Sequence, residues 1–493
     1  MSLRARIPSL GLLPHRLDML NTLTMATGVA TQAAPEWASQ TVQALQGLHV
    51  EAVLLPLLWQ VALIILAARL FATLFRQLGQ PSTVGEIAAG LAIGPSLLGQ
   101  LAPDLYHSIF HPALEGVPLA VSDQLFRWIL TSFSQFGLIL LLFLMGMEFD
   151  FKHLKVSGKS AIAVSVTGVL FPFGLGMLVA TLLYPILGQG IDRLGFTLFL
   201  GTSMSITAIP VLGRIMQELG IVRSKIAALT ISAAAVDDAL GWILLATVSA
   251  MVRSGLSGGS GINGGQAMLM MLETVIFSLG MVYVIRPLLR QWVARALNNE
   301  TRELSLNSIA MLLAILFSCA IVTNLIGIFA IFGAFVLGAI LSEEHEFREA
   351  VNRKFRDFVT AFFLPIFFAY TGSRTDIGTL GSWPMWGLCG LVSLAAIVGK
   401  FGGCGVAAWL TGSRPREAAC IGVMMNTRGL MELVVINVGK DLGVIPDSVY
   451  CMLVIMALVT TVMTTPILLR TMRGTELEPM IEASGFLKGQ KLA

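Results

Sequence analysis

Two adjacent aspartates inside an apolar stretch are the strongest indication of chemistry in this chain. Asp237 and Asp238 are surrounded by Ala, Val, Ile and Leu within residues 224–252. An ionised carboxylate at the centre of a bilayer costs roughly 2.5–3.5 kcal/mol, so two together require a partner or a function. Capping or bending a buried helix is the weaker explanation. We therefore interpret the pair as facing an ion pathway.

Lys400 is the basic residue best placed to meet these aspartates. It falls a little past the middle of the apolar stretch 383–411, at a depth similar to theirs, as a Lys–Asp ion pair requires. Adjacent helical positions point about 100° apart, so one aspartate can face Lys400 while the other faces a water-filled cavity. A carboxylate that titrates near neutral pH can hold either a proton or a small hard cation. If the proton and the cation compete for this carboxylate on each side of the membrane, the protein exchanges one for the other.

Two apolar stretches are interrupted near their middle, at residues 207–210 and 426–429. Pro210 lacks a backbone donor and excludes a regular turn before it, which frees carbonyl groups. Those carbonyls and the Thr207 hydroxyl could coordinate an alkali cation, although a transmembrane proline alone often marks only a kink. The ends of half-helices carry about half a unit of charge, which Asp and Lys side chains nearby would offset.

The remaining deep polar residues have weaker claims to ion binding. Arg428 and Glu432 are four positions apart on the second interrupted stretch and can pair with each other. Glu86 lies nearer to the end of its stretch. We expect structural or gating roles for these three residues, and also for Pro210 and Asn426.

The composition places the chain among polytopic membrane proteins. Of its 493 residues 55% are hydrophobic and 12% are charged, and the mean hydropathy is +0.81. The five cysteines fall in or at the ends of apolar stretches without paired spacing, which argues against a disulfide framework and a zinc site. The sequence contains no Walker loop, so it gives no support for ATP-driven transport, and it contains no His-Glu-x-x-His motif.

Thirteen apolar stretches, each near the ~20 residues needed to cross a bilayer, follow one another from residue 52. They cover residues 52–75, 82–101, 129–148, 159–187, 194–217, 224–252, 266–291, 304–323, 325–342, 356–373, 383–411, 416–439 and 446–470. Residues 1–51 are then an N-terminal extension, and residues 471–493 are a short cytoplasmic tail.

Lys and Arg concentrate in alternate loops, and this bias predicts the orientation. The odd-numbered loops are rich in them, as in the 343–355 loop with Arg348, Arg353 and Lys354, whereas each even-numbered loop holds one or none. By the positive-inside rule the odd-numbered loops are cytoplasmic. The N-terminus is therefore expected outside and the C-terminus inside.

A weak internal repeat appears at an offset of seven stretches. Residues 85–94 are similar to 332–341, and the interruption at 207–210 matches that at 426–429. An odd offset reverses orientation, so stretches 1–6 and 8–13 would be inverted repeats joined by 266–291. Inverted repeats with interrupted helices at matching positions indicate a secondary transporter with its site near the bilayer midplane.

These motifs together resemble those of the monovalent cation:proton antiporters. That family belongs to the sodium/hydrogen exchanger superfamily, and the resemblance is to its Kef-type and plant cation/proton exchanger branch. The similarity is carried, in the expected order across about 52–470, by residues 85–99, 146–148, 207–210, 237–238, 399–400 and 426–433. Residues 426–443 are especially similar to the plant exchangers.

The resemblance implies an all-α membrane protein of about thirteen transmembrane helices. These would form two inverted six-helix repeats with two interrupted, crossing helices, in a homodimer surrounded by lipid. The scaffold would comprise residues 52–148 and 304–373, and the ion-binding core 159–252 and 383–470, with 266–291 as linker. We expect a bacterial inner-membrane location and no Kef-type nucleotide-binding domain after the last helix.

The resemblance also assigns roles to the polar residues. It implies that Asp238 is the principal ligand of a transported Na⁺ or K⁺ and that Asp237, beside it, pairs with Lys400. Relatives with two aspartates and this lysine tend to be electrogenic. The implied function is therefore electrogenic exchange of a monovalent cation for protons by alternating access. Ala234 stands where some relatives place a serine one turn before the ion-binding aspartate.

Other classes of function fit the residues less well. An intramembrane aspartyl protease needs carboxylates that converge on one water, whereas neighbours on a helix diverge. A channel needs a continuous polar path, whereas these residues form an isolated cluster. A sodium-coupled symporter for an organic solute can share this fold and is the alternative, but Lys400 beside the aspartates favours proton coupling. We expect no enzymatic activity, no cofactor besides the transported ions and no nucleic-acid partner.

Overall fold

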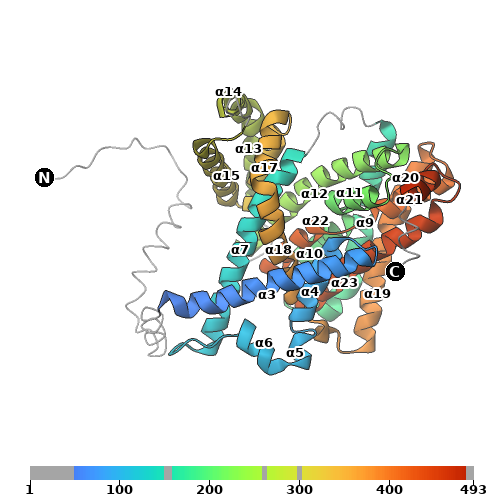
Figure 1. Cartoon of the computed structure of the whole chain (residues 1–493). Helices are drawn as coiled ribbons and strands as arrows, with labels where there is room; N and C mark the ends of the chain where they lie inside the picture. The colour runs from blue at the N-terminus through green and yellow to red at the C-terminus, as the bar shows by residue number, and fades with distance from the viewer. Residues whose placement is uncertain (1–48, 149–157, 258–263, 297–302, 485–493) are drawn as a thin grey trace.

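The computed structural model describes residues 49–148, 158–257, 264–296 and 303–484, which are predominantly helical (Figure 1). The predicted extension 1–51 therefore lies almost entirely outside the described residues. The helices are α3 (Val50–Gln77), α4 (Ser82–Ile93), α5 (Leu98–Leu101), α6 (Pro103–Phe110), α7 (Leu119–Glu148), α9 (Lys159–Leu187), α10 (Arg193–Ser205), α11 (Ile209–Glu218), α12 (Lys225–Ser257), α13 (Gly264–Gly280), α14 (Arg286–Ala296), α15 (Leu306–Ile326), α16 (Ala330–Leu341), α17 (His345–Phe358), α18 (Leu364–Ser373), α19 (Trp383–Ile397), α20 (Gly403–Leu410), α21 (Pro415–Met425), α22 (Leu430–Asp441), α23 (Asp447–Thr471) and α24 (Leu477–Ser484).

The described helices include nine that are long and apolar enough to cross a membrane, or ten if the bent pair α21–α22 counts as one span. The prediction of an all-α membrane protein is confirmed. The count of thirteen is not confirmed, because the remaining predicted spans are built from shorter pieces. The stretch 194–217 is divided into α10 and α11, and α16 has 12 residues.

Two pairs of helices cross with their backbones in close contact. In α4 and α18, a Cβ added at Gly90 or Gly372 would meet a backbone carbonyl oxygen of the partner helix at 2.0 or 2.4 Å. In α7 and α16, a Cβ added at Gly146 or Gly338 would meet one at 2.3 or 2.1 Å. The predicted repeat relates α4 to α16 and α7 to α18, so the two crossings are equivalent. This equivalence supports the inverted repeat.

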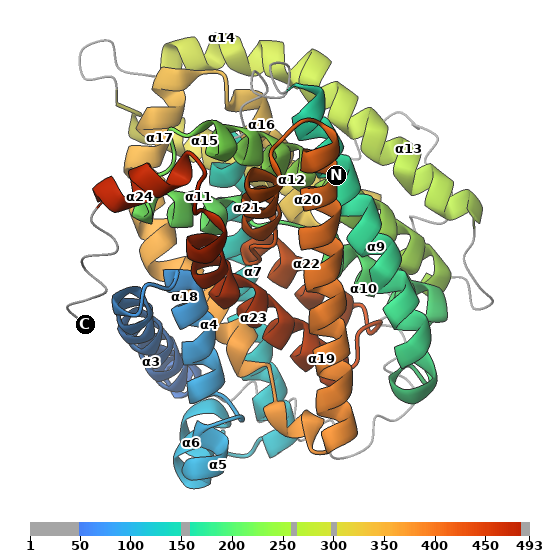
Figure 2. The same ribbon diagram turned by 90° about the vertical axis from the view of Figure 1, so that its right-hand side faces the viewer.

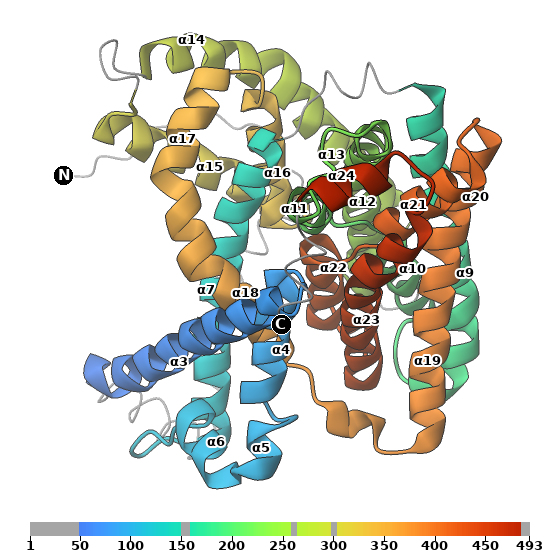
Figure 3. The same cartoon turned by 45° about the vertical axis from the view of Figure 1, so that its right-hand side comes forward.

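The helices pack as two groups, which Figure 3 separates from left to right. Helices α3–α7 and α15–α18, here called the scaffold group, pack mainly on one another through α4–α3, α4–α18 and α7–α16 contacts. Helices α9–α12 and α19–α23, here called the core group, pack through α9–α10, α9–α12 and α20–α21 contacts. The functional division of the chain into scaffold and ion-binding core remains a prediction.

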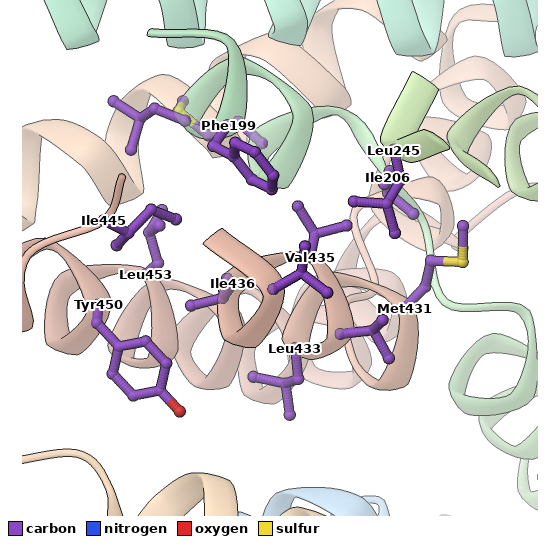
Figure 4. Close-up of a cluster of buried hydrophobic side chains, with 14 of the residues drawn as sticks. Phe199, Ile206, Leu245, Met431, Leu433, Val435, Ile436, Ile445, Tyr450 and Leu453 are labelled. Atoms are coloured by element: carbon purple, nitrogen blue, oxygen red, sulfur yellow. The ribbon is translucent and has the colours of Figure 1, made fainter. Parts of the chain in front are cut away.

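Helix α22 lies at the centre of the core group. All residues from Leu430 to Gly439 are buried. Figure 4 shows Phe199 of α10 and Leu453 of α23 packed around the apolar side chains of α22. Because water does not reach any side of its first ten residues, every polar group on this helix must find a partner within the protein or bind a ligand.

The two groups also touch through aromatic side chains. The indole of Trp242 on α12 stacks on the ring of Phe335 on α16, with a centroid distance of 5.3 Å. The Arg253 guanidinium lies 4.5 Å from the centroid of the Phe329 ring, between α15 and α16. These are side-chain contacts between apolar or planar surfaces, unlike the backbone contacts within the scaffold group.

The stretch 343–355, predicted as a loop, is mostly helical. It belongs to α17, which continues through a π-helical turn (Val359–Phe363) into α18. Phe347, Ala350 and Val351 are buried on one face. The high charge of this stretch concealed an apolar stripe at helical spacing, because the charged residues occupy the opposite, exposed face.

The basic character of α17 yields a test of orientation. We expect a cysteine at the exposed position Glu349→Cys to react with a membrane-impermeant thiol reagent only from the cytoplasmic side, because positively charged loops are retained there. Labelling of right-side-out and inverted vesicles measures this. The native cysteines are buried and give a low background.

A matched control is Gln189→Cys, at an exposed turn on an even-numbered loop, which should react only from outside. The reverse pattern at both positions would overturn the predicted orientation.

Candidate ion-binding site

The first interrupted helix divides into α10 and α11. Helix α10 ends at Ser205, and Ile206 and Ala208 have extended backbone before α11 begins at Ile209. Pro210 is the second residue of α11, where its missing N–H costs no helical hydrogen bond. The proline thus begins a new half-helix.

The second interrupted helix meets the first at this point. Helices α21 and α22 are bent by 45° across residues 426–429. The backbone N–H of Ala208 donates to the carbonyl oxygen of Thr427 at 3.0 Å, and the Thr207 hydroxyl donates to that of Met425 at 2.8 Å. The two interruptions therefore cross and hold each other by hydrogen bonds, as the predicted repeat requires.

Lys400 and Asp237 form a buried ion pair beside this crossing. Lys400 lies on a π-helical turn (Val398–Gly402) between α19 and α20, which pack along α9 (Figure 2). Its Nζ lies 2.8 Å from Asp237 Oδ2 and 3.0 Å from Oδ1, and both side chains have 0% exposure. Nζ also donates to the carbonyl oxygens of Gly168, at 2.8 Å, and Ser205. The ammonium group is thus surrounded by oxygen acceptors.

Asp237 also satisfies the positive end of a half-helix. Its Oδ2 accepts a hydrogen bond of 2.8 Å from the backbone N–H of Thr207, immediately before α11. Carboxylates are stabilised at helix N-termini, where backbone N–H groups are unpaired and the helix dipole is positive. Asp237 is therefore engaged on two sides and has little capacity left for another ligand.

Arg428 neutralises the opposite, negative end of a half-helix. Its Nη1 and Nη2 donate to the carbonyl oxygens of Ser203, at 2.7 Å, and Met204, at 2.6 Å, in the last turn of α10. The predicted partner Glu432 lies farther away, with 3.6 Å between Arg428 Nε and Glu432 Oε2. Arg428 lies 225 and 224 positions along the chain from Ser203 and Met204. The periodicity of a single helix therefore could not predict these two hydrogen bonds.

Asp238 differs from its neighbour in having spare hydrogen-bonding capacity. It is 3% exposed, and its Oδ1 has no hydrogen-bond partner among the described residues. The same holds for Asn426 Oδ1 and both carboxylate oxygens of Glu432. Leaving a buried acceptor unpaired costs about 1–3 kcal/mol, more for a charged group, so such oxygens are places where a proton, a water molecule or a cation can bind.

The formal charges of the cluster point to a single positive ligand. If all five groups are ionised, Asp237, Asp238 and Glu432 carry three negative charges, and Lys400 and Arg428 carry two positive ones. The remaining negative charge is offset by one proton or one monovalent cation. Alkali cations prefer the carboxylate, amide and carbonyl oxygens found here.

Glu86 lies on α4, in the scaffold group rather than in this cluster. It is 2% exposed, and its Oε2 has no hydrogen-bond partner among the described residues. Its charged neighbours are Arg69, Arg76 and Arg214. One turn earlier, Ser82 Oγ accepts a hydrogen bond of 2.6 Å from Arg214 of α11, so this region also connects the two groups of helices.

Comparison with known proteins identifies the family. Residues 62–471 match the transmembrane sodium/hydrogen exchanger family. The chain belongs to this family. It is 38% identical over 419 residues to Na(+)/H(+) antiporter NhaS4 of Synechocystis sp., which covers 85% of this chain and 97% of that protein. It is 36% identical over 430 residues to Cation/H(+) antiporter 20 of Arabidopsis thaliana, but spans only 49% of that protein's length.

A solved structure extends the comparison to the fold. The sodium proton antiporter MjNhaP1 from Methanocaldococcus jannaschii superimposes with a TM-score of 0.58 at 14% identity, over 85% of this chain and 99% of that one. The predicted family and all-α antiporter fold are confirmed. The family consists of multi-pass membrane transporters, not enzymes, as the sequence indicated.

The contacts of Arg428 predict a large effect on stability. Arg428→Gln should destabilise the protein by about 3–5 kcal/mol, because Glu432 loses its charge partner and the carbonyls at the end of α10 lose their donors. Thermal unfolding in detergent measures the effect. The exposed Arg473→Gln is the matched control and should unfold like the unmodified protein. Equal stability of both variants would contradict the capping role of Arg428.

Proposed function

We propose that the protein is a secondary active antiporter that exchanges Na⁺ or K⁺ for protons across the membrane by alternating access. The observation that carries this proposal is the buried Asp238 carboxylate, which has an unpartnered oxygen beside the crossing of two interrupted helices. Its neighbour Asp237 is already engaged by Lys400 and by the backbone of Thr207. Asp238 is therefore the carboxylate available to a transported ion.

Exchange follows from competition at Asp238. Protons and a monovalent cation compete for the carboxylates of the cluster, and binding of the cation displaces protons. The Thr207 hydroxyl, whose proton is donated to Met425, still offers its lone pairs to a cation, as do Asn426 Oδ1 and the backbone around the crossing. We propose that the neutralised core then moves relative to the scaffold and exposes the site to the other side. The cycle requires no cofactor.

The sodium-coupled organic-solute symporter is the less favoured reading. The relatives in the comparisons are named as antiporters, and the cluster is built from charged groups suited to a small cation. We further propose a homodimer in a bacterial inner membrane, with the N-terminus outside and the C-terminus in the cytoplasm. The basic loops support this orientation.

The first test is Asp238→Asn, in which an amide of similar shape replaces the carboxylate. We expect cation-driven proton movement to fall to the background of protein-free liposomes, because an amide neither titrates nor offsets the charge of a cation. Proteoliposomes with an internal pH dye, challenged with Li⁺, Na⁺ and K⁺ in turn, measure this. Asp104→Asn, at an exposed position on α6, is the control and should transport normally. Full cation–proton exchange by the Asp238→Asn variant would show that Asp238 is not the ion-binding carboxylate.

The second test asks whether Lys400 carries one of the transported protons. In that mechanism the cation displaces Asp237 from Lys400, which then releases its proton, and exchange is electrogenic. In the other mechanism Lys400 only balances the charge of Asp237 and of the α10 carbonyls, and both transported protons are carried by carboxylates. We favour the first, in which Lys400→Gln makes exchange electroneutral or stops it.

The membrane-potential response of proteoliposomes, scored with the melting temperature of the same preparation, separates the two mechanisms. Because Lys400 donates to Gly168 and Ser205 as well as to Asp237, some loss of stability is expected in either case. Electrogenic exchange that persists in a destabilised Lys400→Gln protein would exclude the proton-carrier role.

A further inference from the structure

A second polar cluster joins the two groups of helices, at the end of the molecule where α18 stops against α22 and α23. Arg374 follows the last residue of α18, and its Nη2 lies 2.8 Å from Oδ1 of Asp441, the last residue of α22. Its Nη1 donates to Asn437 Oδ1 at 3.4 Å. The ion pair thus spans from the scaffold group to the core group.

Neutral hydrogen bonds reinforce this connection. Asn437 Nδ2 donates to Thr371 Oγ1 at 3.0 Å, across the same interface. The buried Tyr450 hydroxyl of α23 contacts Asn437 Oδ1 at 2.9 Å and the carbonyl oxygen of Thr371 at 3.2 Å. Lys440 Nζ donates to the carbonyl oxygen of Arg374 at 3.3 Å. The end of α18 is therefore held against the core at several points.

The ion pair lies where an open cavity narrows. A cavity of about 520 Å³ between α7 and α18 is lined in part by Thr131, Tyr370, Arg374 and Asp441. The same four residues also line a second, inner space of about 10 Å³, which Ser134 and Asn437 continue toward the interior. An inner space of that size holds about one water molecule. Arg374 and Asp441 thus occupy the neck between a wide vestibule and a closed passage.

The α22 residues that line the inner space, Val434, Asn437, Val438 and Asp441, follow one face of the helix. Leu138 and Phe367 add apolar side chains to the same lining. At a rise of 1.5 Å per residue, the eleven steps from Asp441 back to Leu430 cover about 16 Å, which ends at the interruption of α21–α22. The vestibule, the neck and the interruption are therefore stacked along one helix.

We propose that Arg374, Asp441 and Asn437 form the gate of an ion pathway that leads from this vestibule to Asp238. In the present structure the gate is closed. The proposal rests on the antiport function proposed above. The side chains of Arg374 and Asp441 are 21% and 33% exposed, so water can replace each partner when the pair separates.

Accessibility of a cysteine beyond the neck tests the gate without measuring transport. Ser134→Cys places a thiol in the inner passage, where Ser134 is 7% exposed. We expect slow reaction with an impermeant thiol reagent in this background. Adding Asp441→Asn or Arg374→Gln should raise the rate roughly fivefold or more, the lower end of typical conformational coupling. The exchanged pair, Arg374→Asp with Asp441→Arg, should restore slow labelling.

Asp447→Asn is the matched control. Asp447 forms an ion pair of 2.9 Å with Lys440, which in turn donates to the backbone carbonyl of Arg374, so its loss should change the labelling rate much less than loss of Arg374 or Asp441. A further arm needs no charge variant: raising the ionic strength should speed the labelling of Ser134→Cys alone, because salt screens a partly exposed pair. The salt dependence of this labelling also tests the gate if a charge variant fails to fold.

Unchanged labelling with both charge variants and with salt, or equal acceleration by Asp447→Asn, would overturn the gate. Because labelling is read in the absence of exchange, the outcome is separate from that of the proposed function. A protein that did not exchange cations but showed the expected labelling would retain the gate and lose the antiport assignment. Normal cation exchange with unchanged labelling would support the antiport assignment and exclude the gate.

Discussion

The structure depends on how the ends of two half-helices are satisfied where water cannot reach them. The last carbonyls of α10 accept hydrogen bonds from Arg428 and Lys400, and the N–H before α11 donates to Asp237. Each charged residue thus completes a helix end that the chain itself leaves open. The arrangement explains why charged side chains are tolerated at this depth, whereas Oδ1 of Asp238 has no such partner among the described residues.

The parts of the site that the sequence made predictable are those in which a residue contrasts with its surroundings. Asp237, Asp238 and Lys400 interrupt apolar stretches, and their similar depth predicted an ion pair before any distance was known. Pro210 located one interruption, and the repeat located the other. The contacts of Arg428 were not predictable, since its carbonyl partners have no side-chain signature. Arg374 and Asp441 were equally hidden, because a charged residue at a helix end is normally solvated.

The fold shows the same division between strong and weak signals. Long apolar stretches such as α9 and α23 were located to within a few residues, because length and hydropathy alone define them. The number of spans was less determinable, since half-helices and the 12-residue α16 do not reach membrane length individually. Helix α17 was missed because its charges outnumber its three buried apolar residues.

The glycine crossings described above have a mechanical meaning. At Gly90 and Gly372, and again at Gly146 and Gly338, the backbones are so close that the helices cannot slide past one another without collision. The scaffold is therefore expected to behave as one rigid unit, because its helices are held together at two close backbone crossings. The surface between the scaffold and the core combines a flat aromatic contact, Trp242 on Phe335, with the polar contacts of Arg374 described above. If the core moves against the scaffold during transport, as proposed, the movement must separate Arg374 from Asp441 and slide Trp242 over Phe335.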